Sequence, residues 1–144
     1  MSLIETTGIH HVRLTVTDLS RSRTFYQEVL GFTVVAESAG DPADPQVRAD
    51  PAQLYGGVVF QTNGILLGLR PVAAASDRFD SGRVGLDHLS FSVSSIGELS
   101  QVAMRLDDAG IVHGEVTDLD LFGIAILSFS DPDGIHLELT APLT

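Results

Sequence analysis

The sequence predicts an α+β fold built from two modules, each with the element order β-α-β-β-β. The main observation is an internal repeat, because residues 85–93 (GLDHLSFSV) repeat the pattern of residues 8–16 (GIHHVRLTV). Apolar and polar residues alternate in both copies, as in a strand with one face on a core. Aligning the two glycines places His88 over His11, an offset of 77 residues. Each copy is followed by a helical pattern, which supports a repeated structural unit.

The two predicted helices have recognisable start and stop signals. Asp18 is a good N-cap for a helix over residues 18–31. Ser95 and Glu98 have the spacing of a capping box for a helix over residues 95–109. A glycine follows the apolar stripe of each helix and is expected to end it.

The remaining segments complete the two modules. Strands are predicted at residues 9–17, 32–37, 54–61, 65–70, 86–93, 111–117, 121–130 and 135–140. The chain is thus expected to be one domain over residues 1–144, with a repeat over 8–70, a linker over 71–85 and a repeat over 86–140. A helix on one face of each sheet leaves the other face open. We therefore expect a curved mixed sheet with the helices on its outer face.

Residues 40–53 interrupt the first module. They contain three prolines and no apolar periodicity. Loops longer than about 12 residues are uncommon in compact domains unless they are functional or disordered. The segment is therefore predicted to be a mobile loop, either a disordered excursion or a lid over a site.

Composition excludes several classes of function. The chain has no cysteine, so disulfides, thiolate metal sites and thiol nucleophiles are excluded. Its net charge is −11 and all eight basic residues are arginines, which argues against nucleic acid as a partner. No apolar run reaches the ~20 residues of a membrane span, and no signal peptide is visible. We expect a cytoplasmic protein that acts on a small-molecule substrate, without membrane association.

Three residues form a candidate metal site. His11 and His88 lie on the polar faces of the repeated strands, and Glu138 lies on the polar face of the last strand. Two imidazoles and one carboxylate suit a divalent metal ion such as Fe²⁺, Mn²⁺, Zn²⁺ or Ni²⁺. Alternatively, each histidine is simply a hydrogen-bonded strand residue. The matched positions of the two histidines favour the metal.

Further polar residues are candidates for substrate binding and catalysis. Arg13 and Ser90 share the polar faces and, with Arg70, are the candidate substrate-binding residues. The fork of Arg13 suits a carboxylate or phosphate, although a solvated arginine at the rim is an alternative. Glu138, His136 and Tyr55 are the candidate catalytic residues. His136 suits a general base or a partner of the metal ligands, or is a rim histidine without a role.

The chain resembles the vicinal oxygen chelate superfamily, which includes glyoxalases, extradiol dioxygenases, fosfomycin-resistance transferases and bleomycin-resistance proteins. The resemblance rests on residues 9–12 (IHHV), 25–32 (FYQEVLGF) and 131–134 (DPDG), the last followed by Glu138. It implies metal ligands at His11, His88 and Glu138. The fourth position is Gly68, which has no side chain, and this departs from glyoxalase I.

The resemblance implies a metal-dependent enzyme that chelates a small oxygen-bearing substrate. A ring-cleaving dioxygenase, a lyase and an isomerase remain open as activities. A homodimer is expected. The alternative is a non-catalytic small-molecule-binding protein of the bleomycin-resistance type.

Overall fold

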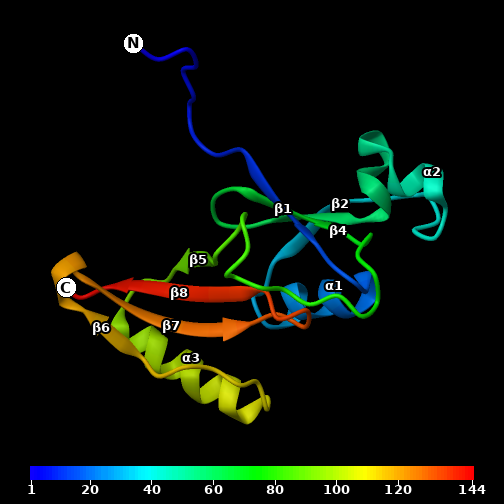
Figure 1. Cartoon of the computed structure of the whole chain (residues 1–144). Coiled ribbons are helices and arrows are strands. Elements are labelled where there is room, and N and C mark those ends of the chain that lie inside the picture. Colours follow the sequence, from blue (N-terminus) through cyan, green and yellow to red (C-terminus); the bar gives the residue numbers. More distant parts are fainter. The chain divides into compact units, whose positions relative to one another are not determined.

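The computed structural model describes residues 1–144 and divides into two compact units, Met1–Asp77 and Arg78–Thr144. The division falls within the predicted linker. Each unit is an α+β module with one four-stranded mixed sheet, which confirms the predicted fold class (Figure 1). The first unit contains β1 (His11–Thr15), α1 (Leu19–Glu28), β2 (Thr33–Glu37), α2 (Pro45–Arg48), a 3₁₀ segment η1 (Pro51–Gly56), β3 (Val58–Gln61) and β4 (Leu66–Arg70). The second contains β5 (Leu89–Ser92), α3 (Ile96–Asp108), β6 (Thr117–Leu119), a 3₁₀ segment η2 (Asp120–Phe122), β7 (Ile124–Ser130) and β8 (His136–Pro142).

The two sheets share one topology and one register. Their strand orders are β1-β4-β3-β2 and β5-β8-β7-β6. In the first sheet β1 pairs with β4 in parallel, and in the second β5 pairs with β8 in parallel. Arg13 lies opposite Gly68 in the first sheet, and Ser90 lies opposite Glu138 in the second. This register confirms the alignment of the two sequence repeats, including the correspondence of Gly68 with Glu138.

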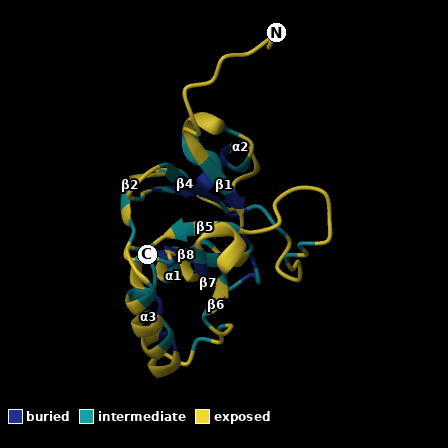
Figure 2. Cartoon of the chain, turned by 90° about the vertical axis from the view of Figure 1, so that its left-hand side faces the viewer, coloured by how far each residue is buried: buried dark blue, intermediate teal, exposed yellow.

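The helices bury the apolar stripes that their spacing predicts. In α1, Ser22 and Tyr26 are buried, and the Tyr26 ring packs on Phe60 of β3 with 6.0 Å between ring centroids. In α3, Leu99 and Leu106 are buried, and the helix packs against β7 and β8. Figure 2 shows the exposed colour along one side of α3 and over the whole segment before β1. No helix is both long enough and apolar enough to cross a membrane.

Of the two alternatives for residues 40–53, the disordered excursion is wrong, whereas the mobile lid stays a prediction. The segment contains α2 and the start of η1, and Val47 is buried. Each short helix begins at a proline that directly follows an aspartate. The aspartate carboxylate accepts a hydrogen bond from a backbone amide in the first turn. Asp44 Oδ1 accepts from the Gln46 amide at 2.9 Å, and Asp50 Oδ1 accepts from the Ala52 amide at 2.9 Å. Proline is well suited to the first helical position after such a cap, so the prolines start helices here.

Four predicted strands begin three or more residues later than expected or are largely absent. The strand predicted at 86–93 begins at Leu89, so His88 lies just before it. The strand predicted at 54–61 begins at Val58, because Leu54 and Tyr55 have left-handed φ values of 53° and 55°. The strand predicted at 121–130 begins at Ile124, after η2 and a left-handed glycine. Residues 111–117 contribute one isolated bridge, between His113 and Phe129, and only the first residue of β6.

Candidate metal and substrate sites

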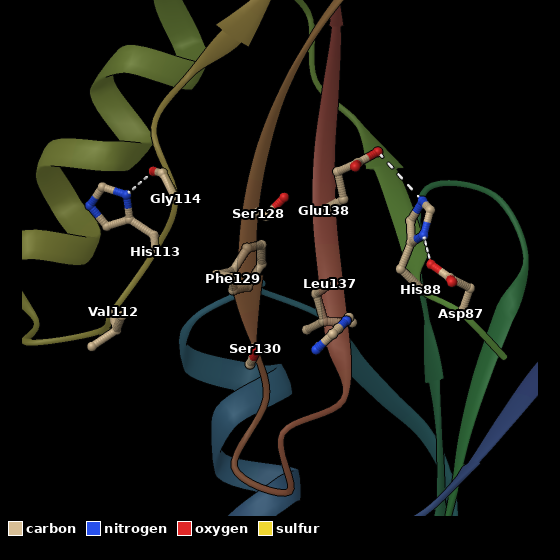
Figure 3. A pocket seen from close by; sticks show the side chains of 11 residues that line it. Asp87, His88, Val112, His113, Gly114, Ser128, Phe129, Ser130, Leu137 and Glu138 are labelled. Carbon is tan, nitrogen blue, oxygen red and sulfur yellow. Dashed lines mark hydrogen bonds and ion pairs between the residues drawn. The ribbon is translucent and has the colours of Figure 1, made fainter. Parts of the chain in front are cut away.

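A pocket of about 570 Å³ lies on the polar face of the second unit (Figure 3). The strands β7 and β8 form its floor, since Ser128, Glu138 and His136 alternate there with buried apolar residues. The chain before β5 contributes Asp87 and His88, and residues 112–114 close another side. The predicted residues His88, His136 and Glu138 are therefore brought together, as strand parity indicated.

His88 is held in one orientation by its sequence neighbour. Its Nδ1 lies 2.6 Å from Asp87 Oδ1, and a carboxylate accepts, so Nδ1 donates. The hydrogen bond with Asp87 raises the pKa of His88 above its ordinary value of 6.5. Burial opposes this rise in pKa, and the negative charges of Glu138 and Asp87 add to it. In the neutral ring, a proton on Nδ1 leaves Nε2 with a free lone pair, which is the form that binds metals.

Glu138 is oriented by a short chain of hydroxyl groups. Thr140 Oγ1 donates to Glu138 Oε1 at 3.2 Å. The Ser90 hydroxyl is hydrogen bonded to Thr140 Oγ1. Because the single proton of Thr140 is already used, Ser90 must be the donor. Ser90, predicted as a substrate contact, thus also supports the orientation of the carboxylate.

Nε2 of His88 and Oε1 of Glu138 face one another at 3.8 Å (Figure 3). This separation is longer than a hydrogen bond. Two donors that each lie about 2.1 Å from one ion at tetrahedral or octahedral angles are ~3.0–3.4 Å apart. A divalent ion therefore fits between the two groups after a small side-chain shift. The donor set, one imidazole nitrogen and one carboxylate oxygen, suits the metals predicted from the sequence.

Two further histidines line the same pocket but differ from His88. His136 packs edge-on against Phe79, with 5.3 Å between ring centroids. His113 places Nδ1 against the Gly114 carbonyl at 2.6 Å and Nε2 against Asp107 Oδ1 at 2.7 Å. Both partners are acceptors, so both contacts are hydrogen bonds only when both ring nitrogens are protonated. The Gly114 carbonyl, followed by Asp107, raises the pKa of His113 accordingly. Neither nitrogen of His113 is available to a metal in this state.

The third predicted metal ligand, His11, belongs to the first unit. Its Nδ1 lies 2.8 Å from Nδ1 of His10, so one of the two rings donates to the other. No three His, Asp or Glu side chains gather in the structure in a way that could hold a metal ion. The grouping of His11 with His88 and Glu138 stays a prediction.

The first unit brings together Arg13, Tyr55 and Arg70. The guanidinium carbons of Arg13 and Arg70 lie 5.1 Å and 3.9 Å from the centroid of the Tyr55 ring. Tyr55 belongs to η1, not to the predicted strand. A Cβ at Gly68 would lie 3.2 Å from Arg13 Nη1. The Arg13 side chain therefore borders the place that a side chain at Gly68, the fourth position of the family pattern, would occupy.

Two residues that hydrogen bond to the candidate site residues were not predicted from the sequence. Asp87 directly precedes His88, and an acidic neighbour of a candidate ligand is a signal that sequence alone offers. Thr140 shares the face of Glu138 two residues on, but its bond to Ser90 depends on the pairing of β5 with β8.

The fold is a pair of repeated α+β modules, and comparison with known proteins gives its family. A family model described as Glyoxalase/Bleomycin resistance protein/Dioxygenase superfamily matches residues 8–139. The chain belongs to this superfamily.

Individual relatives agree with this assignment. An uncharacterized protein of Bacillus subtilis, YwkD, is 29% identical over 92% of this chain and 94% of its own. The crystal structure of a glyoxylase/bleomycin resistance protein/dioxygenase domain from Frankia sp. EAN1pec is 31% identical, with TM-score 0.72, over 96% of this chain and 93% of that one. Lactoylglutathione lyase from Agrobacterium tumefaciens shares the fold, with TM-score 0.68 and 20% identity over 94% of each chain.

Proposed function

We propose that the protein is a metal-dependent enzyme that binds a small oxygen-bearing substrate on a divalent ion. His88 and Glu138 would supply two ligands, and His11, the repeat counterpart of His88, a third. Protein ligands of this number leave coordination positions for two substrate oxygens. The reaction would be of the lyase, isomerase or ring-cleaving dioxygenase type, the activities that the family resemblance implies.

The observation that carries the proposal is the arrangement around His88. Asp87 fixes Nδ1 as the protonated nitrogen, and Nε2 then points its lone pair at the Glu138 carboxylate across 3.8 Å. An imidazole whose far nitrogen donates to a carboxylate is the common arrangement at metal-binding histidines. A protonated His88 would gain from the charge of Glu138 at this distance, whereas the neutral ring gains from it only through a shared metal ion.

The bound ion would act as a Lewis acid that polarises a substrate oxygen. The protein's own groups orient its ligands and shape the pocket. The Ser90–Thr140 pair orients the Glu138 carboxylate, and the Asp87 carboxylate holds the His88 ring. His136 lies on the same strand face as Glu138, where its ring can exchange a proton with a bound substrate. Its contact with Phe79 limits the orientations of that ring.

Metal content and turnover test the proposal together. The protein is stripped with a chelator and reloaded separately with Fe²⁺, Mn²⁺, Zn²⁺ or Ni²⁺. It is then assayed against 2-oxoaldehyde–thiol adducts and catechols. We expect one equivalent of metal per chain and turnover that only reloaded protein shows. Glu138→Gln should lose both, whereas Glu115→Gln, an exposed carboxylate outside the pocket, should lose neither.

The alternative is a binding protein without catalysis, of the bleomycin-resistance type. It predicts ligand binding that is unchanged by chelation and by Glu138→Gln. That result would contradict the metal-dependent function. The homodimer expected from the resemblance stays a prediction, which sedimentation of the reloaded protein would test.

A further inference from the structure

Arg13 and Arg70 of the first unit differ from the arginines of this acidic chain that form ion pairs. Arg23 pairs with Glu37 at 2.7 Å, and Arg105 pairs with Glu98. Arg13 and Arg70 are only partly exposed and have no carboxylate partner. In a chain with 19 acidic and eight basic residues, a counter-ion from the protein itself would be easy to supply. Arg13 and Arg70 nevertheless lack an acidic side chain as a counter-ion.

Each of the two guanidinium groups has a donor that is buried and unused. Arg13 Nη1 and Arg70 Nε are shielded from solvent and have no hydrogen-bond partner. A buried charged donor without a partner carries a desolvation penalty that no interaction offsets. Such donors in native proteins call for a specific explanation, and a missing ion is one of them.

The surrounding chain fixes this arrangement. Tyr55 lies beneath both guanidinium groups, and it and Leu54 have left-handed φ values. Residues other than glycine are strained in that region and persist only where their surroundings hold them. Arg48 provides part of that hold, since its guanidinium donates to the carbonyls of Pro71 and Val72 just beyond β4. The Arg48 carbonyl in turn lies 3.5 Å from Arg70 Nη2.

Gly68 gives Arg13 its room. It faces the same side of the sheet as Arg13, its partner in the register. A Cβ there would lie 3.2–3.3 Å from three atoms of the Arg13 side chain, closer than ordinary contact. Gly68 is not in a left-handed conformation, so the glycine is explained by the neighbouring arginine and not by the backbone.

We infer that Arg13, Arg70 and Tyr55 form a subsite for an oxyanion, a carboxylate or phosphoryl group, on the polar face of the first sheet. On binding, the two guanidinium groups turn their unused donors towards the anion, which accepts hydrogen bonds from them and neutralises their charge. Arginine suits this task because its planar fork matches carboxylate and phosphate oxygens. The ligand of the protein is accordingly an anion. The subsite does not depend on a metal, so it stands or fails separately from the proposed function.

The test is a titration of chelator-treated protein with sodium acetate and with sodium phosphate at constant ionic strength. Acetamide serves as the neutral control. Two-dimensional NMR of the arginine side chains follows Nε–H of Arg70 and Arg13 directly in the wild-type chain. We expect saturable shifts of both signals with at least one of the anions and none with acetamide. The anion with the lower dissociation constant identifies the chemical group. Absence of saturable shifts with both anions would overturn the inference.

Variants test the assignment of residues. Arg13→Gln and Arg70→Gln should each weaken anion binding about tenfold or more, the effect of one lost charge-assisted hydrogen bond. Gly68→Ala should also weaken it, because the new methyl group displaces Arg13 while both charges remain. Arg23→Gln, which removes a charge from the same unit at an ion pair, should bind as the wild type does. Equal affinities in Arg13→Gln, Arg70→Gln and Arg23→Gln, all folded by circular dichroism, would contradict the proposal.

Discussion

The polar faces of the two sheets depend on single residues whose partners decide what they can do. His88 and His113 both line the pocket of the second unit, yet only His88 keeps a nitrogen for a ligand. The sequence showed the parity that brings His88 and Glu138 to one face. It did not show that Ser90 would bond to Thr140, because that contact requires the parallel pairing of β5 with β8.

Removing the Asp87 carboxylate should weaken metal binding without removing a ligand. In Asp87→Asn the charged acceptor for Nδ1 of His88 is replaced by a neutral amide. The amide can accept or donate a hydrogen bond, so it no longer fixes the proton on Nδ1. Such partners of metal ligands typically contribute about 10–100-fold to metal affinity. Calorimetric titration with Zn²⁺ measures the change, with Asp118→Asn, an exposed residue outside the pocket, as the control. An Asp87→Asn affinity equal to that of the control would show that His88 is not oriented by Asp87.

His113 should make stability depend on pH. Its pKa in the folded protein is raised above the ordinary 6.5 by the Gly114 carbonyl and Asp107. The folded state therefore binds the proton more tightly than the unfolded state. The resulting stabilisation is fully present below pH 6.5 and is lost as the pH rises through the folded pKa. Urea unfolding measures the free energy of unfolding at pH 6 and at pH 9. The decrease between the two pH values should be smaller for His113→Gln than for the wild type. An identical change in both would contradict the raised pKa.

At the scale of elements, the β-α-β-β-β order and the helix stripes followed from periodicity, because each element buries one face. The short helices of residues 45–56 did not follow from it, because they bury little and depend on local hydrogen bonds. The signal was present as Asp-Pro pairs at 44–45 and 50–51, where the carboxylate caps the helix that the proline starts. Tyr55 was misplaced for the same reason, since its left-handed backbone is set by this capped segment.

These caps give a prediction for stability. Asp44→Ala should lower the free energy of unfolding by about 1 kcal/mol, the usual cost of losing an N-cap side chain. Asp44→Asn removes the same charge but retains the capping oxygen, so it should cost much less. Urea denaturation of the two variants and the wild type measures the difference. If both variants lose the same amount, the charge of Asp44 matters and its hydrogen bond does not.

At the scale of the whole molecule, the proposed metal ligands come from both units, whereas the anion subsite belongs to the first alone. An ion that binds only the folded protein stabilises it, by about 4 kcal/mol when its concentration is a thousand times the dissociation constant. We therefore expect chelation to lower the thermal midpoint of the wild type. The thermal midpoint of His11→Ala should not respond to chelation, although His11 lies in the first unit. A normal response in His11→Ala would remove that residue from the ligand set.

The central claim is that His88 and Glu138 bind a divalent metal, and a comparison of two neighbouring residues on one strand face tests it most directly. Metal titration is performed on Glu138→Ala and His136→Ala, which both alter the floor of the same pocket. We expect Glu138→Ala to lose metal binding outright, because a direct ligand is removed. His136→Ala should lose no more than the roughly 10–100-fold typical of a supporting residue. Equal losses in the two variants, or full metal affinity in Glu138→Ala, would contradict the account.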